Sequence, residues 1–212
     1  MTRAVARRRR RLARLGRSGW LAALMLALAA CSSPAPLPTK YVLGAPPDAA
    51  AASLAQTGLP VVEVKLVRMP DYLDTTDLLV RSGGEIVASG KARWGERLSL
   101  GVTRALVLAL AARVPDMAVI MAPSVERPAR QVLVDITAFE SRSDRQVVFA
   151  GRWTITDGAG RSVVATEETS LVEAAAGPGD AAVVAAMTRV VEQLADQLAR
   201  AVERSRPRAP PA

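Results

Sequence analysis

Apolar residues recur at spacings of three and four near the end of the chain, and this pattern constrains the fold most. The positions are Val183, Met187, Val190, Val191, Leu194, Leu198 and Val202. Such spacing places them on one side of an α-helix, which we expect to begin at Asp180 as N-cap and to end at Arg204. A helix with one apolar stripe needs a second layer to cover it, so we expect it to pack on a sheet.

Three stretches before this helix supply that sheet. We expect strands at 131–140, 146–156 and 161–173, because turn-forming residues separate them at 141–144 and 157–160. Strands joined by such short turns pair with their neighbours in the chain. The sequence therefore predicts an antiparallel meander.

The strands expected in the first half of the mature chain are shorter than those in the second half. Val62, Val64 and Leu66 alternate with Glu63 and Lys65, which predicts a half-buried strand. Paired glycines at 83–84 predict a hairpin, and Pro115 ends a strongly apolar helix. The expected strands are 41–43, 61–68, 77–82, 85–91 and 117–121, with the helix at 95–113. Together these elements predict a single α+β domain at 39–204, with two principal helices on a mainly antiparallel sheet.

The N-terminus has the order of a bacterial lipoprotein signal. Eight arginines and no acid precede residue 20, and an apolar run follows that is shorter than the roughly 20 residues of a membrane span. Leu28, Ala29, Ala30 and Cys31 then resemble a lipobox. We expect residues 1–30 to be a signal peptide and Cys31 to carry the lipid. The alternative is an ordinary secretory peptide followed by a free or buried thiol.

Two flanking segments have a composition typical of extended chain. Pro34, Pro36 and Pro38 alternate with small residues, so we expect 31–38 to be a flexible tether between lipid and domain. The proline-rich residues 205–212 are predicted to be a disordered tail.

The net charge of +8 comes entirely from the signal segment. Of 28 Lys and Arg residues, 8 lie in residues 1–30, which leaves 20 to face 20 acidic residues. A formally neutral mature chain lacks the basic surface that binding to nucleic acid requires, so no nucleic-acid partner is expected.

The chain has no histidine and a single cysteine, which excludes most catalytic and metal chemistry. Histidine triads, imidazole bases and the commonest zinc sites are absent, and one cysteine cannot form a disulfide within the chain. The acidic pairs Asp71/Asp74 and Glu167/Glu168 are typical of solvated loops and strands. The sequence therefore predicts no cofactor, no metal site and no enzymatic activity.

Six aromatic residues follow the signal segment: Tyr41, Tyr72, Trp94, Phe139, Phe149 and Trp153. Two of them, Tyr72 and Trp94, lie beside predicted turns. Tyr72, Leu73 and Asp74 lie in a proline-started turn, which we interpret as a partner interface. Trp94 opens the apolar helix, and we interpret it, with Trp153, as a structural anchor. The alternative for Tyr72 is a core role, because aromatic residues dominate cores as well as interfaces.

Several short motifs together resemble a known family. They are the lipobox, Tyr41-Val42-Leu43, the Pro-x-Tyr-Leu segment ending at Leu73, the Trp-x-Glu-x-Leu segment from Trp94 to Leu98, and the later Phe139-Glu140 and Trp153. This combination, over roughly residues 28–200, resembles the ABC-type transport auxiliary lipoprotein family. That family includes the lipoprotein subunit of the paraquat-inducible intermembrane transport system.

The resemblance implies a periplasmic domain held at the outer membrane by its N-terminal lipid. Its implied partners are an MCE-domain membrane protein and ABC transporter subunits that carry lipids between membranes, and further copies of itself as a homo-oligomer. Ser32 is not the Asp that retains lipoproteins in the inner membrane, which favours outer-membrane sorting. Two other functions stay open at this point: an envelope assembly lipoprotein that supports an outer-membrane protein, and a periplasmic hydrolase with a carboxylate site.

Overall fold

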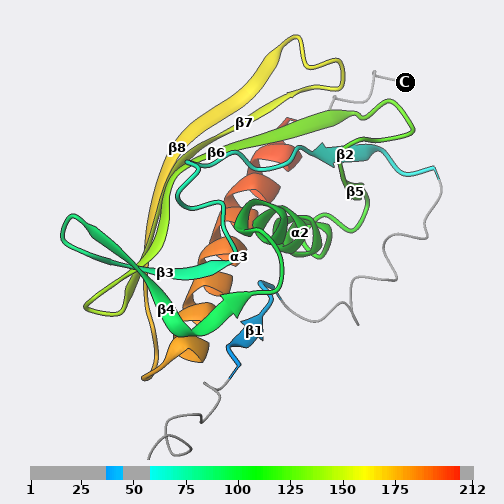
Figure 1. The fold of residues 1–212 in the computed structure, drawn as a ribbon. Helices are drawn as coiled ribbons and strands as arrows, with labels where there is room; N and C mark the ends of the chain where they lie inside the picture. The colour runs from blue at the N-terminus through cyan, green and yellow to red at the C-terminus, as the bar shows by residue number, and fades with distance from the viewer. Residues whose placement is uncertain (1–36, 45–57, 206–212) are drawn as a thin grey trace, which may run out of the picture. The chain divides into compact units, whose positions relative to one another are not determined.

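The computed structural model describes residues 37–44 and 58–205. Eight strands and two helices follow one another in the chain (Figure 1). They are β1 (Thr39–Tyr41), β2 (Val61–Val64), β3 (Asp77–Ser82), β4 (Glu85–Trp94), α2 (Leu98–Ala111), β5 (Ala118–Met121), β6 (Arg130–Arg142), β7 (Gln146–Asp157), β8 (Val163–Ala174) and α3 (Asp180–Arg204). From Pro38 onward they belong to one compact unit, so the α+β class with two helices is confirmed.

The predicted meander is confirmed, but the sheet as a whole is mixed and not mainly antiparallel. β6, β7 and β8 pair antiparallel in chain order, as do β3 and β4. The pairs β1–β4, β2–β5, β2–β6 and β3–β6 are parallel. The expectation was wrong because side-chain alternation reports which face of a strand is buried, and carries no information on which strand lies beside it.

The boundaries of β4 and α2 also differ from those expected. β4 continues to Trp94 because β1 pairs with its last three residues, a contact between segments 53 residues apart in register. The helix begins only at Leu98, after a turn in which the Gly95 N–H donates to the Tyr41 carbonyl at 2.7 Å. Pairing with β1 thus extends β4 beyond the predicted strand, and a turn replaces the first three residues of the predicted helix.

The core lies between the curved meander and the two helices. All seven residues of the predicted stripe on α3 are buried, and α3 packs against α2, β7 and β8. Figure 1 shows the long strands β6–β8 bending together along α3. Phe139 and Phe149 meet edge to face in this layer, with ring centres 5.7 Å apart. None of the helices in the described ranges is long and apolar enough to cross a membrane.

Glu63 is an exception to the half-buried strand expected at β2. All four residues of β2 are buried, because β5 and β6 flank the strand and the loop after β5 meets the Glu63 carboxylate. That carboxylate accepts the Ser124 N–H at 2.6 Å and pairs with Lys65. Burial raises the pKa of Glu63, but these hydrogen bonds and the Lys65 charge lower it by more, so its pKa lies below the ordinary value.

A bend in β6 separates the part of the strand that pairs with β2 from the part that pairs with β3. The β6–β7 register shifts between Ile136 and Ala138, which marks a bulge. Opposite the bulge is Gly151, where an added Cβ would lie 2.6 Å from the Asp135 carbonyl oxygen. Only glycine permits this approach of the two strands. Beyond the bend, β6 pairs with β3, and before the bend it pairs with β2.

Candidate docking surface

The segment between β2 and β3, residues 65–76, carries the predicted interface and is called the connector below. Its first part follows β6: the Lys65 N–H donates to the Val132 carbonyl at 2.9 Å, and Arg68 exchanges backbone bonds with Val134 and Ile136 at 3.0 and 2.8 Å. The Arg68 side chain pairs with Asp135 at 2.5 Å, which holds the pKa of Arg68 above its ordinary value. The connector is therefore attached to the meander although it belongs to the other half of the chain.

Leu73 does not have the role predicted for it. Its side chain is fully buried, with 0% exposure, in a turn closed by its N–H donating to the Pro70 carbonyl at 2.9 Å. A side chain in that position cannot touch a partner. Its burial instead stabilises the turn, because an apolar side chain of this size is stabilised by removal from water.

Asp74, the third residue of the predicted interface, is bonded to the start of α2. Its Oδ1 accepts the backbone N–H of Ser99 at 3.0 Å in the first turn of α2, and its other oxygen pairs with Arg97. The residue at the N-cap position, Arg97, makes no side-chain capping bond, so Asp74 supplies from outside the acceptor that a helix start needs. Burial raises the pKa of Asp74, but the bonds from Ser99 and Arg97 lower it by more, leaving it below the ordinary value.

Tyr72 is the exposed residue of the predicted trio, with 40% of its surface accessible. Its hydroxyl donates to Glu140 Oε2 at 3.3 Å and accepts from Arg81 Nη2 at 3.1 Å. The Arg81 guanidinium also lies 5.7 Å from the centre of the Tyr72 ring, within the range of a cation–π contact. The ring is thereby held in one orientation at the surface.

Arg81 and Glu140 support the ring from below. Arg81 forms a two-pronged ion pair with Glu140, one bond of which joins Nη2 to Oε2 at 3.1 Å. Only 5% of Glu140 is exposed, and its contact holds the pKa of Arg81 above the ordinary value. From the sequence, Glu140 was recognised only as part of a motif, and Arg81 was not predicted to belong to the site. A glutamate among the apolar residues of a long strand was the available signal.

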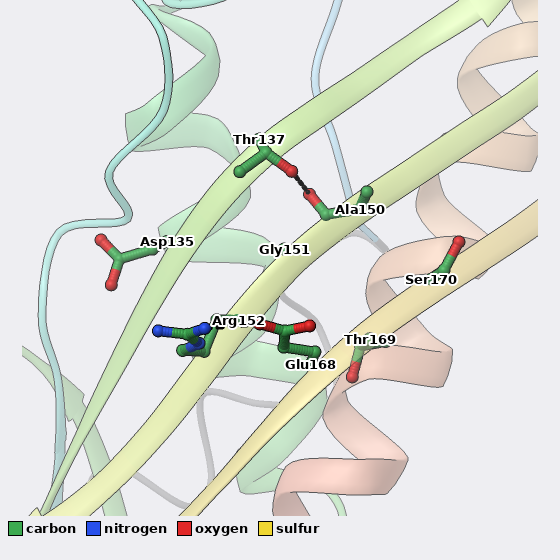
Figure 2. A pocket seen from close by; sticks show the side chains of 8 residues that line it. All are labelled: Asp135, Thr137, Ala150, Gly151, Arg152, Glu168, Thr169 and Ser170. Atoms are coloured by element: carbon green, nitrogen blue, oxygen red, sulfur yellow. Dashed lines mark hydrogen bonds and ion pairs between the residues drawn. The ribbon is translucent and has the colours of Figure 1, made fainter.

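A shallow trough of about 590 Å³ crosses β6, β7 and β8 on the sheet face opposite the helices (Figure 2). Small residues form its floor and two ion pairs, Arg68–Asp135 and Arg152–Glu168, stand beside it. Its lining residues are Asp135, Thr137, Ala150, Gly151, Arg152, Glu168, Thr169 and Ser170. Tyr72, Arg81 and Glu140 are called the Tyr72 cluster. Glu140 projects from the same face of β6 as Asp135, so the trough and the Tyr72 cluster belong to one polar side of the sheet.

The chemistry of this side favours binding over catalysis. Its carboxylates face arginines, and an acid paired in this way is a poor proton donor or nucleophile. Within residues 37–44 and 58–205, no three acidic side chains gather as a metal site would require.

The two tryptophans predicted as anchors are buried. The Trp94 backbone N–H donates to the Thr76 carbonyl at 2.7 Å, which ties the end of β4 to the connector. Trp153 is 2% exposed, and its Nε1–H donates to Gln197 of α3 at 3.3 Å. Leu28, Ala29, Ala30, Cys31 and Ser32 lie outside the described residues, as do most of the predicted tether and tail.

The fold defines the protein as a two-layer α+β domain built on a mixed sheet. The chain belongs to the family of ABC-type transport auxiliary lipoprotein components, whose sequence model matches residues 41–199. The family description names a lipoprotein that is an auxiliary component of ABC-type transport. No curated protein matches the chain.

Many solved structures match this fold, and two of them are similar over most of the chain. One, an uncharacterized protein, is 20% identical with a TM-score of 0.66, and the match covers 79% of this chain and 99% of that one. The other, a protein from Xanthomonas campestris, is 18% identical with a TM-score of 0.58, covering 80% and 96% of the two chains. At these identities the likeness shows the fold alone.

Proposed function

We propose that this protein is the lipid-anchored docking subunit of an ABC transport system that uses an MCE-domain protein to carry lipids between the two bacterial membranes. Family membership supports the association with an ABC transporter. The lipobox and Ser32 support an anchor in the outer membrane, with the domain on its periplasmic face. The protein acts without catalysis, by holding a partner at a fixed place.

The anchor sets how far the domain reaches. Seven residues lie between Cys31 and Thr39 at the start of β1, which makes eight steps from one Cα atom to the next. At about 3.3 to 3.6 Å per residue they span at most about 29 Å. The docking surface therefore works close to the membrane that holds the lipid.

The observation that carries the docking role is the Tyr72 ring. It is an exposed aromatic side chain, yet Arg81 and Glu140 hold it in place and Leu73 and Asp74 fasten its turn beneath. Aromatic anchors dominate the energy of protein interfaces, and a side chain that is already ordered loses less entropy on binding. We assign the Tyr72 cluster to the MCE-domain partner.

The lipid anchor is tested by Cys31→Ser. Acylation forms a thioether through the cysteine sulfur, so we expect the variant to take up no labelled fatty acid and to leave the membrane fraction. The measurement is metabolic labelling followed by fractionation. Equal label in the variant and in the unchanged protein would contradict the assignment of Cys31.

The docking role is tested by photo-crosslinking in cells that express the full transport system. A photoreactive phenylalanine analogue replaces Tyr72, and a matched protein carries it at Val163, an exposed residue at the start of β8. We expect an adduct with the MCE-domain protein from position 72 and none from position 163. Adducts of equal yield from both positions, or none from 72, would contradict the proposal.

A further inference from the structure

Several turns of the domain lie at the end where the chain enters it. β1 pairs in parallel with the last three residues of β4, so the chain before Thr39 approaches from the side on which β4 begins. β4 begins after the hairpin turn at Gly83 and Gly84. The start of α3 lies beside β4, because the Ser89 hydroxyl donates to Asp180 Oδ2 at 3.1 Å.

Two further segments meet at the same end. The Ser143 N–H, in the turn between β6 and β7, donates to the Arg81 carbonyl at 3.0 Å. The Ala175 N–H, just after β8, donates to the Arg145 carbonyl at 3.0 Å. Figure 1 shows the β3–β4 hairpin, the β6–β7 turn and the start of α3 on the same side of the domain. This surface is called the anchor end and consists of residues 39–40, 82–91, 142–146 and 174–181.

The length of the tether brings the anchor end within reach of the bilayer. The eight steps from Cys31 to Thr39 span at most about 29 Å. The seven steps along β4 from Glu85 to Ala92, the residue that pairs with Thr39, cover at most about 24 Å at 3.4 Å each. The hairpin thus extends nearly as far from the start of β1 as the tether does, and it can meet the membrane when the tether is less than fully extended.

The β3–β4 hairpin has apolar side chains on both of its faces. Consecutive residues of a strand point to opposite faces, yet Ile86 and Val87 are both exposed, with 36% and 54% of their surface accessible. Val80 lies opposite Val87 in the same hairpin and is half-buried. Exposed apolar residues that gather in this way mark a surface that contacts a protein or a membrane.

Charge favours a membrane as the occupant. Four exposed cations of the anchor end form no ion pair within residues 37–44 and 58–205, namely Lys40, Lys91, Arg142 and Arg145. The acidic residues of this end are fewer: Glu85, Asp144 and Asp180. Apolar side chains flanked by an excess of cations suit the headgroup layer of an anionic bilayer. Because the lipid already confines the domain to the membrane, a weak contact is sufficient.

We propose that the anchor end rests on the periplasmic surface of the membrane that holds the lipid. Ile86 and Val87 enter the headgroup layer, and Arg142 and Arg145 lie against its phosphates. The partner is therefore an anionic phospholipid surface. This inference rests on the lipid anchor of the proposed function and not on Tyr72. The contact uses the end of the sheet, so the Tyr72 cluster, on the sheet face, stays free for the MCE-domain partner.

The test uses the purified, lipidated full chain in vesicles of phosphatidylethanolamine and phosphatidylglycerol, with no transport partner. Cys31 is the only cysteine of the chain and carries the lipid, so a fluorophore can label Val87→Cys alone. The matched control is Val163→Cys, at the start of β8, whose other end belongs to the anchor end. Nitroxide groups on the lipid headgroups quench fluorophores near the bilayer. We expect several-fold stronger quenching at position 87 than at position 163.

Flotation of the same vesicles separates this contact from the lipid anchor. Protein that does not float would contradict the lipid anchor, and this contact with it. Protein that floats but shows equal quenching at both positions, or none at position 87, would contradict the contact alone.

Charge reversal measures the part played by the two arginines. In the Val87→Cys protein, Arg142→Glu together with Arg145→Glu should lower the quenching by about two-fold or more, because an anionic surface repels the new charges. The control pair, Arg142→Lys with Arg145→Lys, should leave the quenching unchanged. Quenching that the charge reversal does not alter would contradict the contact of these arginines with phosphates.

Discussion

The meander with α3 and the first half of the chain with its connector are built by different means. In the meander each strand pairs with the next one in the sequence, and turns of a few residues set the order. In the first half, β2 and β3 both pair with β6. Two side-chain bonds hold the connector: Arg68 to Asp135, which are 67 positions apart in the sequence, and Tyr72 to Glu140, which are 68 positions apart. The regular half thus supplies the scaffold, and the half held by distant contacts supplies the candidate docking surface.

The largest expected effect lies in the scaffold. Trp153→Ala should lower the free energy of unfolding by about 3 to 5 kcal/mol, because it leaves a cavity between β7 and α3 and removes the bond to Gln197. Urea unfolding measures the loss. Val163→Ala, at an exposed position of the neighbouring strand, should change stability by less than about 0.5 kcal/mol. A small effect of Trp153→Ala would mean that the meander is not the centre of stability.

An intermediate effect is expected where the connector meets α2. Asp74→Asn should cost about 1 kcal/mol at pH 7, since it removes the charge at the helix start and the pair with Arg97. The folded-state pKa of Asp74 lies below its unfolded value, so its contribution is present above the unfolded pKa and disappears as the pH falls through the folded one.

The difference in unfolding free energy between the Asp74→Asn variant and the unchanged protein should therefore narrow on acidification from about pH 5 toward pH 2. Parallel urea titrations across this range measure it. A difference that stays constant with pH would show that the carboxylate charge does not stabilise the start of α2.

The regular half could be predicted from sequence, and the connector could be predicted only in part. The stripe from Val183 to Val202 and the turns between β6, β7 and β8 are local signals, and the structure confirms both. The burial of Leu73 was not predictable from its neighbours, because Pro70, Asp71 and Asp74 around it are typical of a solvated turn. The parallel pairs were missed because no property of β2 in the sequence identifies β6 as its partner.

The candidate site shows the same division. An exposed Tyr72 was predicted from Pro70, Asp71 and Asp74 around it, and the structure places the ring at the surface. Its support by Arg81 and Glu140 depends on β3 lying beside the far end of β6. Residues that meet only through such a crossover cannot be grouped from one sequence.

The most direct test of the docking role separates the stability of Tyr72→Ala from its binding. Because the ring is exposed and its turn is fastened by Leu73 and Asp74, we expect the variant to melt like the unchanged protein. Leu66→Ala, at another exposed apolar residue of the connector, is the matched control. The measurement is recovery of the MCE-domain protein by each purified, lipidated variant. The account predicts strong loss for Tyr72→Ala and full recovery for Leu66→Ala, and full recovery by both would contradict it.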